Sequence, residues 1–149
     1  MRRTSFNDAI CPIARTSDLI GDGWSPLIMR EACSGTRRFE DFQSNLSIPR
    51  ATLTARLDGL VEAGLLRRER YQDQSSREHY RLTQQGREFY SVLAAMWRFG
   101  SDWLFDGDLQ VELTDRETGE PVQPVVVDAH TGRPIDVRKI AVAVVPGRR

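Results

Sequence analysis

Hydrophobic positions recur at helical spacing through residues 12–105 and lose that spacing afterwards. Residues 12–20 predict a first helix, because proline is favoured in the first turn of a helix and Gly21 directly follows its last residue. Residues 24–33 predict a second, with apolar side chains spaced along one helical face. The opening of the chain is therefore predicted to be helical.

Two shorter helices with a tight turn between them are predicted next. The first covers 40–46, and Ser47 is the predicted N-cap of the second, which has Pro49 in its first turn and ends near Gly64. A capped amphipathic helix after a short helix and a tight turn is typical of a helix-turn-helix. The side chains predicted to face inward from the second helix are Leu53, Leu57, Leu60 and Val61.

A β-hairpin is predicted directly after this motif. Residues 65–71 and 78–82 have strand character, and the polar segment 72–77 joins them. Thr83 then caps a long helix that runs to about Trp103. The predicted fold class is mainly α with a small β-hairpin wing, that is, a winged helix-turn-helix.

The helix predicted over 83–103 has two adjoining apolar stripes. Because one helix normally buries a single stripe in its own core, we predict that a second copy of the chain covers the other stripe. The first and last helices are thus predicted to form a homodimer interface. Its predicted residues are Ile13, Phe89, Leu93, Met96, Trp97 and Trp103.

Residues 106–149 form a predicted β-rich extension to the domain at 1–105. The pattern D-x-x-T-G-x-P occurs at 115–121 and again at 128–134. This spacing is similar to that of the two knuckles of a zinc ribbon, but Asp and Thr stand where zinc needs Cys or His. We therefore predict a zinc-ribbon-like hairpin pair without metal, in which Asp side chains hold the turns.

A metal site in the extension is the alternative to this interpretation. It would use Asp115, Asp128 and His130 to bind Ca²⁺ or Zn²⁺. The prediction for the chain as a whole is that it holds no metal and no cofactor.

Composition and charge exclude some classes of protein and favour no particular partner. The 149 residues are 40% hydrophobic, and 21 basic residues balance 21 acidic ones. Residues 1–105 have a net charge of +2, and residues 106–149 have a net charge of −2. No stretch approaches the roughly 18 apolar residues that span a membrane, and the N-terminus lacks the pattern of a signal peptide. With only two cysteines, we expect a soluble cytoplasmic protein.

Spaced motifs over residues 10–105 carry a family resemblance. They include Cys11-Pro12, Asp18-Leu19-Ile20-Gly21, Arg30-Glu31, Arg38-Phe39, Leu53-Thr54-Ala55-Arg56-Leu57, Gly64-Leu65 and Tyr80-Arg81-Leu82-Thr83. Together they resemble the HxlR family of bacterial transcriptional regulators. The resemblance implies a homodimeric winged helix that binds a palindromic or repeated operator in double-stranded DNA. In family members that sense electrophiles or oxidants, a Cys before a Pro near the N-terminus is the switch.

The N-terminal end of the second helix of the motif is expected to enter the major groove of DNA. We predict that Arg50 reads a base, preferably guanine, because a guanidinium bonds that base bidentately. Thr52 would contact a thymine methyl group or a phosphate, and Ser47 a phosphate. The alternative for this face is a plain solvated helix surface. Two further candidates on or near it are Thr54 and Arg56, the latter with an ion pair to Asp58 or Glu62 as its alternative.

Basic and hydroxyl side chains beside the helix-turn-helix are candidates for contacts to the DNA backbone. At the tip of the wing, Ser75, Ser76 and Arg77 would reach the minor groove or its flanking phosphates. Along the preceding strand, Arg68 and Arg70 would follow the backbone. Before the first helix of the motif, one of Arg37 and Arg38 would hold a phosphate.

Cys11 is the candidate redox sensor. It precedes the first helix, and Arg15 follows one turn later, which favours a reactive thiolate. The alternative is a small apolar side chain that fills the dimer interface. Cys33 is predicted to lie in the core.

The predicted function is sequence-specific transcriptional regulation, by a repressor rather than an activator, in response to a small molecule or a thiol modification. No nucleophile–base pattern or phosphate-binding glycine loop occurs, so an enzyme is not predicted. The alternative from another class is a winged helix that docks a protein partner and does not bind specific DNA. Salt dependence separates the two, since phosphate contacts make affinity fall steeply with salt.

Overall fold

The computed structural model describes residues 5–70, 78–107 and 109–143, which divide into two compact units, Met1–Leu93 and Ala94–Arg149. The predicted domain boundary at 105/106 lies beyond this division, which falls inside the last helix. The elements are α1 (Pro12–Ile20), α2 (Ser25–Cys33), α3 (Phe39–Leu46), α4 (Arg50–Glu62), β1 (Leu66–Arg70), β2 (Glu78–Leu82), α5 (Gln84–Glu88), α6 (Tyr90–Trp103) and the 3-10 helix η1 (Val137–Lys139). No helix in these ranges is long and apolar enough to cross a membrane.

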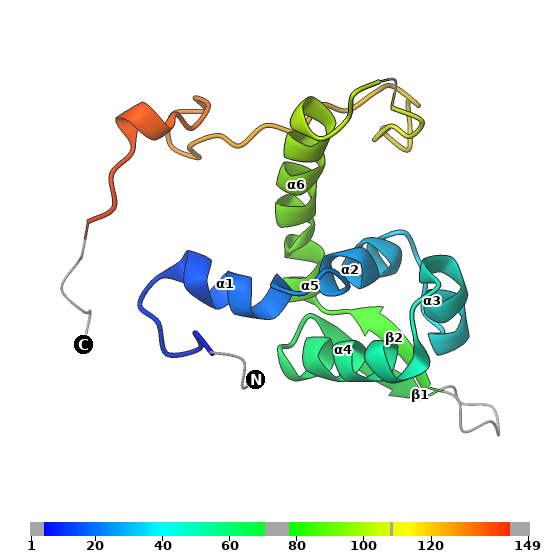
Figure 1. Cartoon of the computed structure of the whole chain (residues 1–149). Coiled ribbons are helices and arrows are strands. Elements are labelled where there is room, and N and C mark those ends of the chain that lie inside the picture. The colour runs from blue at the N-terminus through cyan, green and yellow to red at the C-terminus, as the bar shows by residue number, and fades with distance from the viewer. Residues whose placement is uncertain (1–4, 71–77, 108, 144–149) are drawn as a thin grey trace. The chain divides into compact units, whose positions relative to one another are not determined.

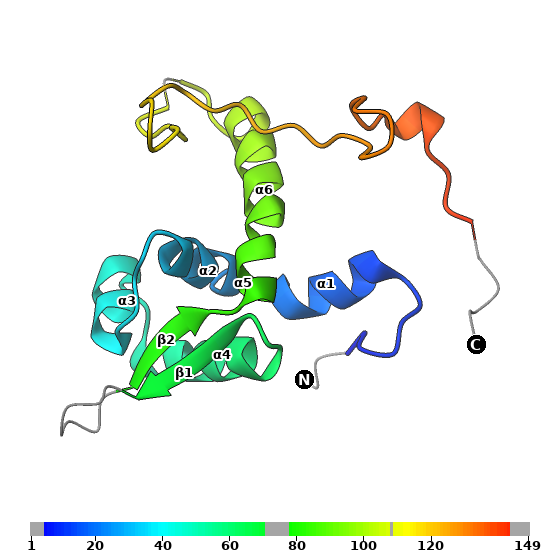
Figure 2. The same ribbon diagram turned by 180° about the vertical axis from the view of Figure 1, so that it is seen from behind.

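The first unit has the predicted architecture, with α2, α3 and α4 grouped around the start of a two-stranded antiparallel hairpin (Figure 1). The hairpin packs along α4, as the view from behind shows (Figure 2). Its register pairs Leu66 with Leu82 and Arg70 with Glu78. The predicted wing tip, with Ser75, Ser76 and Arg77, lies outside the described residues.

One core holds these elements together. Phe42 of α3 meets Tyr80 of β2 edge to face, with ring centroids 6.3 Å apart. The buried apolar side chains are Ile28, Met29, Ala32, Phe42, Ile48, Leu53, Leu57, Leu60, Leu65, Leu66, Tyr80 and Phe89. Phe89, one of the predicted dimer-interface residues, fills the core of its own chain and is only 7% exposed, so it offers little surface to a partner.

The turn between α3 and α4 corrects a prediction. Ser47 does not cap α4; it ends α3 in the left-handed conformation, with a φ of +50°. The N-cap of α4 is Pro49, whose fixed φ of −57° leads the chain into the helix two residues later than predicted. Ser47 is nevertheless exposed beside the start of α4.

The helix predicted over 83–103 is divided at Phe89 into α5 and α6. Phe89 keeps helical dihedral angles, but its carbonyl accepts from the N–H of Val92 at 2.9 Å, which tightens one turn. Thr83 caps α5 as predicted, since its hydroxyl accepts from the N–H of Gly86 at 3.0 Å. Of the predicted dimer residues, Ile13, Met96 and Trp103 are exposed, and Leu93 and Trp97 are half-buried.

The two repeats of the extension form the same local turn, and Asp holds both as predicted. Asp115 accepts from the N–H of Glu117 at 2.8 Å, and Asp128 accepts from the N–H of His130 at 2.8 Å. Each turn then closes through a glycine with positive φ, Gly119 or Gly132.

The extension contains less β-structure than predicted. Within residues 109–143 each turn ends in one isolated bridge, Thr114 to Pro121 and Val127 to Pro134, and no strand forms. Proline lacks the N–H that would extend either ladder. The zinc-ribbon-like pairing of the two turns stays a prediction. No group of three His, Cys, Asp or Glu side chains in the described ranges could hold a metal ion, so the alternative site at Asp115, Asp128 and His130 is not formed.

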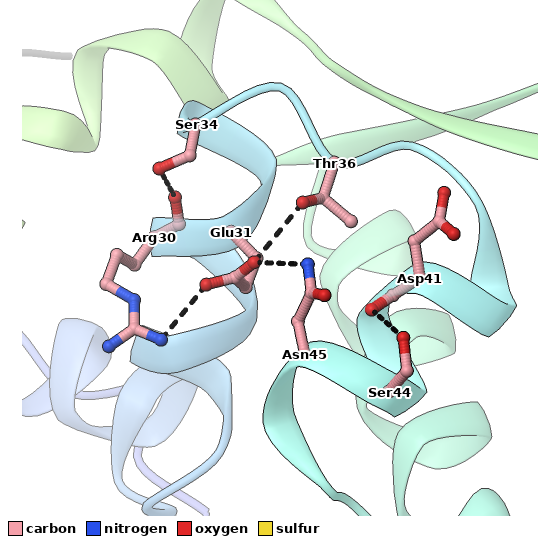
Figure 3. Close-up of polar contacts among 7 residues, drawn as sticks. All are labelled: Arg30, Glu31, Ser34, Thr36, Asp41, Ser44 and Asn45. Carbon is pink, nitrogen blue, oxygen red and sulfur yellow. Dashed lines mark hydrogen bonds and ion pairs between the residues drawn. The ribbon is translucent and has the colours of Figure 1, made fainter.

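Glu31 of α2 fixes the position of α3 (Figure 3). Its carboxylate accepts from Asn45 of α3 at 2.9 Å and from the Thr36 hydroxyl at 3.2 Å, and it pairs with Arg30 at 3.0 Å. Burial alone would raise the pKa of Glu31, but these contacts outweigh it and hold that pKa below its ordinary value of 4.5. The folded state therefore favours the charged form.

We predict that Glu31→Gln lowers the free energy of unfolding at pH 7 by about 1 kcal/mol, because the charged hydrogen bonds are lost. Since the pKa is lowered by folding, this stabilisation is fully present above about pH 4.5 and is lost as the pH falls through the folded value. The difference in the free energy of unfolding between wild type and variant should therefore disappear in acid. Urea denaturation across this range tests it, with the exposed Glu112→Gln as control; a gap that persists in acid contradicts the assignment.

Gly86 has no room for a side chain. A Cβ at this position would lie 2.1 Å from the backbone oxygen of Leu65. We predict that Gly86→Ala destabilises the protein by at least about 1–3 kcal/mol, because backbone must move. Gly59→Ala in α4, where a Cβ meets nothing within 4 Å, should instead stabilise by about 0.5–1 kcal/mol. Thermal unfolding of both variants compares them, and equal melting temperatures would refute the steric argument.

Candidate nucleic-acid interface

The second helix of the motif, α4, presents one face to solvent. Leu53, Leu57 and Leu60 are buried on the opposite face, so the helix cannot rotate without exposing them. The solvent-facing side carries Ala51 and Thr54, and Thr52 is half-buried at its edge. These short side chains allow another molecule to approach the helix backbone closely.

Arg50, the first residue of α4, is held over an aromatic ring. Its guanidinium carbon lies 4.7 Å from the centroid of Phe39, a cation–π arrangement that orients the charge. The side chain is exposed at the helix N-terminus, where free N–H groups also favour anions. The Thr54 hydroxyl donates to the Arg50 carbonyl at 3.0 Å, which leaves the Thr54 methyl group as its apolar surface.

Arg56 has a different ion-pair partner from the two that were predicted as alternatives to DNA. Its Nε lies 3.4 Å from Oδ1 of Asp22, in the turn between α1 and α2, and not beside Asp58 or Glu62. This Nε is buried and has no hydrogen-bond partner in the described part of the chain. Arg56 therefore points toward the flank of α4 and away from its solvent-facing side.

Asp22 is a structural residue that the sequence analysis missed. It accepts from the N–H groups of Trp24 and Ser25, each at 2.8 Å, and from the Ser25 hydroxyl at 2.6 Å. Burial would raise the pKa of Asp22, but these bonds and the charge of Arg56 hold it below the ordinary value. An Asp three residues before Ser-Pro is a helix-start signal that could have identified it.

Arg68, one of the two strand arginines predicted to follow the DNA backbone, forms ion pairs within the fold. Arg68 pairs with Asp58 of α4 and with Glu78 of β2. The Tyr80 side chain, with these two carboxylates, raises the pKa of Arg68 above its ordinary value. Arg68 thus ties the hairpin to α4.

Four of the predicted arginines have no acidic partner. Arg37, Arg38, Arg50 and Arg70 are exposed and form no ion pair with any residue in 5–70, 78–107 or 109–143. The backbone at Arg37 and Arg38 is fixed to β2, since the Arg37 carbonyl accepts from the N–H of Tyr80 at 2.8 Å. These four exposed guanidinium groups are thus available for contacts to phosphate.

A family model described as HxlR-like helix-turn-helix matches residues 19–108. The chain belongs to the HxlR-like family. It is 35% identical over 136 residues to the HTH-type transcriptional regulator Rv3095 of Mycobacterium tuberculosis, which covers 91% of this chain and 86% of the relative. It is 42% identical over 96 residues to the regulator sll1512 of Synechocystis, covering 64% and 71% respectively. Both relatives are named as HTH-type transcriptional regulators.

Solved structures agree with this assignment. PA1607 superposes with a TM-score of 0.85 at 38% identity, covering 94% of this chain and 99% of that one. The redox regulator HypR, in its reduced form, gives 0.57 at 29% identity, covering 62% and 92%. The alignments with Rv3095 and PA1607 reach into residues 106–149, so this HxlR-like chain shares most of its extension with them.

The two cysteines differ in environment. Cys11 is exposed at the N-cap position of α1, whereas Cys33 is half-buried at the end of α2. Burial raises the pKa of the Cys33 thiol, which keeps it protonated. Cys11 is thus the more accessible of the two thiols.

We predict that Cys11 reacts with iodoacetamide at least about tenfold faster than Cys33, because only accessible thiolate reacts. The variants Cys33→Ser and Cys11→Ser each leave one thiol, and mass spectrometry of timed samples gives its rate. Equal rates would show that Cys11 is shielded in the folded protein.

Proposed function

We propose that this chain is a homodimeric transcriptional repressor that binds a palindromic or repeated operator through α4. The observation that carries the proposal is the solvent-facing side of α4, with Arg50 held at its N-terminus over Phe39. A helix presented in this way fits the major groove, and a guanidinium at its start fits guanine. Regulation of chromosomal genes takes place in the cytoplasm, the predicted location.

The contacts divide into base-reading and backbone-holding groups. Arg50 reads a base, Thr54 offers its methyl group to a thymine, and Thr52 and Ser47 contact phosphates at the helix start. The groups that hold the DNA backbone are the cations of Arg70, Arg77 and one of Arg37 and Arg38, and the hydroxyl groups of Ser75 and Ser76 in the wing. Arg56 and Arg68 are left out of this set, because their charges are paired within the fold.

Dimerisation through α1 and α6 gives the protein a two-fold symmetry that matches a palindromic operator. The apolar side chains that the second copy would bury are Ile13, which is 76% exposed, and Trp103, which is 75% exposed, together with Met96, Leu93 and Trp97. A two-fold axis through this interface presents two copies of α4 to half-sites about 34 Å apart. The spacing of the two copies then decides whether the protein binds its operator.

A small molecule or a modification of Cys11 would change this spacing. Cys11 lies at the start of α1, one of the two helices assigned to the interface, and is exposed in the single chain. HypR, at 29% identity, is named as a redox regulator. A bulky or oxidised thiol at this point would disturb the interface and release DNA.

We predict that Arg50→Ala weakens binding to the native upstream DNA by about tenfold or more, the effect of losing one bidentate base contact. The matched control is Arg138→Ala, which removes an exposed arginine of the extension that pairs with Asp136. Fluorescence anisotropy at two salt concentrations, beside a scrambled duplex, measures both affinities. Equal weak binding to both duplexes would contradict the proposal and favour a protein-docking winged helix.

A further inference from the structure

A cavity of about 530 Å³ lies in the first unit between α1 and the flank of α4. Its size falls within the range of small-molecule sites in proteins. Apolar surface comes from Leu19 of α1 and from Ala55 and Leu60 of α4, and cationic groups come from Arg15 and Arg56. The cavity thus combines apolar surface with two guanidinium groups and three carboxylates, those of Asp18, Asp22 and Glu62.

The acceptor groups of this cavity are already occupied. Asp22 accepts three hydrogen bonds from the start of α2, and Asp18 accepts from the Ser5 hydroxyl at 2.8 Å and from the N–H of Phe6 at 3.0 Å. The third carboxylate, Glu62, is exposed to solvent at the end of α4. A ligand therefore finds few free acceptors among the buried groups.

The guanidinium donors of Arg56 and Arg15 in this cavity have fewer hydrogen-bond partners among the described residues than the carboxylates of Asp18 and Asp22 do. Arg56 Nε is buried without a hydrogen bond, and its contact with Asp22 at 3.4 Å is longer than a good charged hydrogen bond. Arg15 donates its Nε to the Ala9 carbonyl at 2.6 Å. A buried N–H donor without a hydrogen-bond partner carries a free-energy cost, and an anionic acceptor that bonds to its guanidinium would remove part of that cost.

We propose that this cavity is the effector site and that it takes a small organic carboxylate with a compact apolar body. The carboxylate accepts from Arg56 and Arg15, while the apolar body rests against Leu19 and Ala55. The regulatory part of this proposal rests on the proposed function, whereas binding of the carboxylate does not.

Arg56 connects the cavity to the DNA-binding helix. It lies on α4 directly beside Ala55, and its ionic contact with Asp22 ties that helix to the turn after α1. A carboxylate that forms an ion pair with Arg56 in place of Asp22 breaks this contact and allows α4 and α1 to shift relative to each other. Because coupling is reciprocal, DNA should weaken carboxylate binding by the same factor by which the carboxylate weakens DNA binding.

The test is calorimetric titration of the full-length protein with benzoate and 1-naphthoate, beside their neutral amides. We expect saturable binding of a carboxylate, no binding of its amide, and a loss of about tenfold or more in affinity in Arg56→Gln but not in Arg138→Gln. Absence of binding by both carboxylates, or equal binding of acid and amide, overturns the site.

A second pair of variants keeps the test valid if Arg56→Gln does not fold. Ala55→Leu, at an exposed helical position that lines the cavity, should narrow it where the apolar body rests and weaken binding. Ala51→Leu, one turn earlier on the same helix and outside the cavity lining, should leave binding unchanged. Unchanged binding in Ala55→Leu would place the ligand elsewhere.

DNA anisotropy with and without the bound carboxylate then separates this inference from the proposed function. We expect the affinity for native upstream DNA to fall several-fold in its presence. DNA binding without carboxylate binding overturns the site and leaves the regulator intact. Carboxylate binding without any DNA binding overturns the proposed function alone, and unchanged DNA affinity overturns the coupling through Arg56.

Discussion

Burial of one apolar face of α4 is the constraint on which the rest of the structure depends. Leu53, Leu57 and Leu60 are almost completely removed from solvent, and each contributes on the order of 1.5–3 kcal/mol. Rotating the helix would expose all three, so its orientation about its own axis is fixed. That orientation decides which side faces solvent, which flank meets the α1–α2 turn, and which residues reach the hairpin.

The orientation of α4 places its charged residues in different surroundings. Arg50 is left exposed at the N-terminus, Arg56 turns toward Asp22, and Asp58 meets Arg68 of the hairpin. A protein with no net charge can thus leave Arg50 exposed while Asp22 and Asp58 pair with other arginines. Affinity for DNA depends on this local distribution and not on the total charge.

The extension is stabilised in a different way. No residue in 109–143 is buried, and the turns are held by short-range bonds from Asp115 and Asp128 to the backbone directly after them. Such turns form without a core, because all their partners lie within a few residues. The alignments with PA1607 and Rv3095 include most of the extension.

The sequence by itself determined the winged helix, the family and the two Asp turns, since these depend on periodicity, caps and bonds between near neighbours. It did not determine the partner of Arg56, the burial of Phe89 or the cavity beside α4. Asp22 and Arg56 are far apart along the chain, and only the packing of α2 against α4 brings them together. The N-terminus of α4 was likewise decided by the fold, because Ser47 takes the left-handed conformation that ends α3.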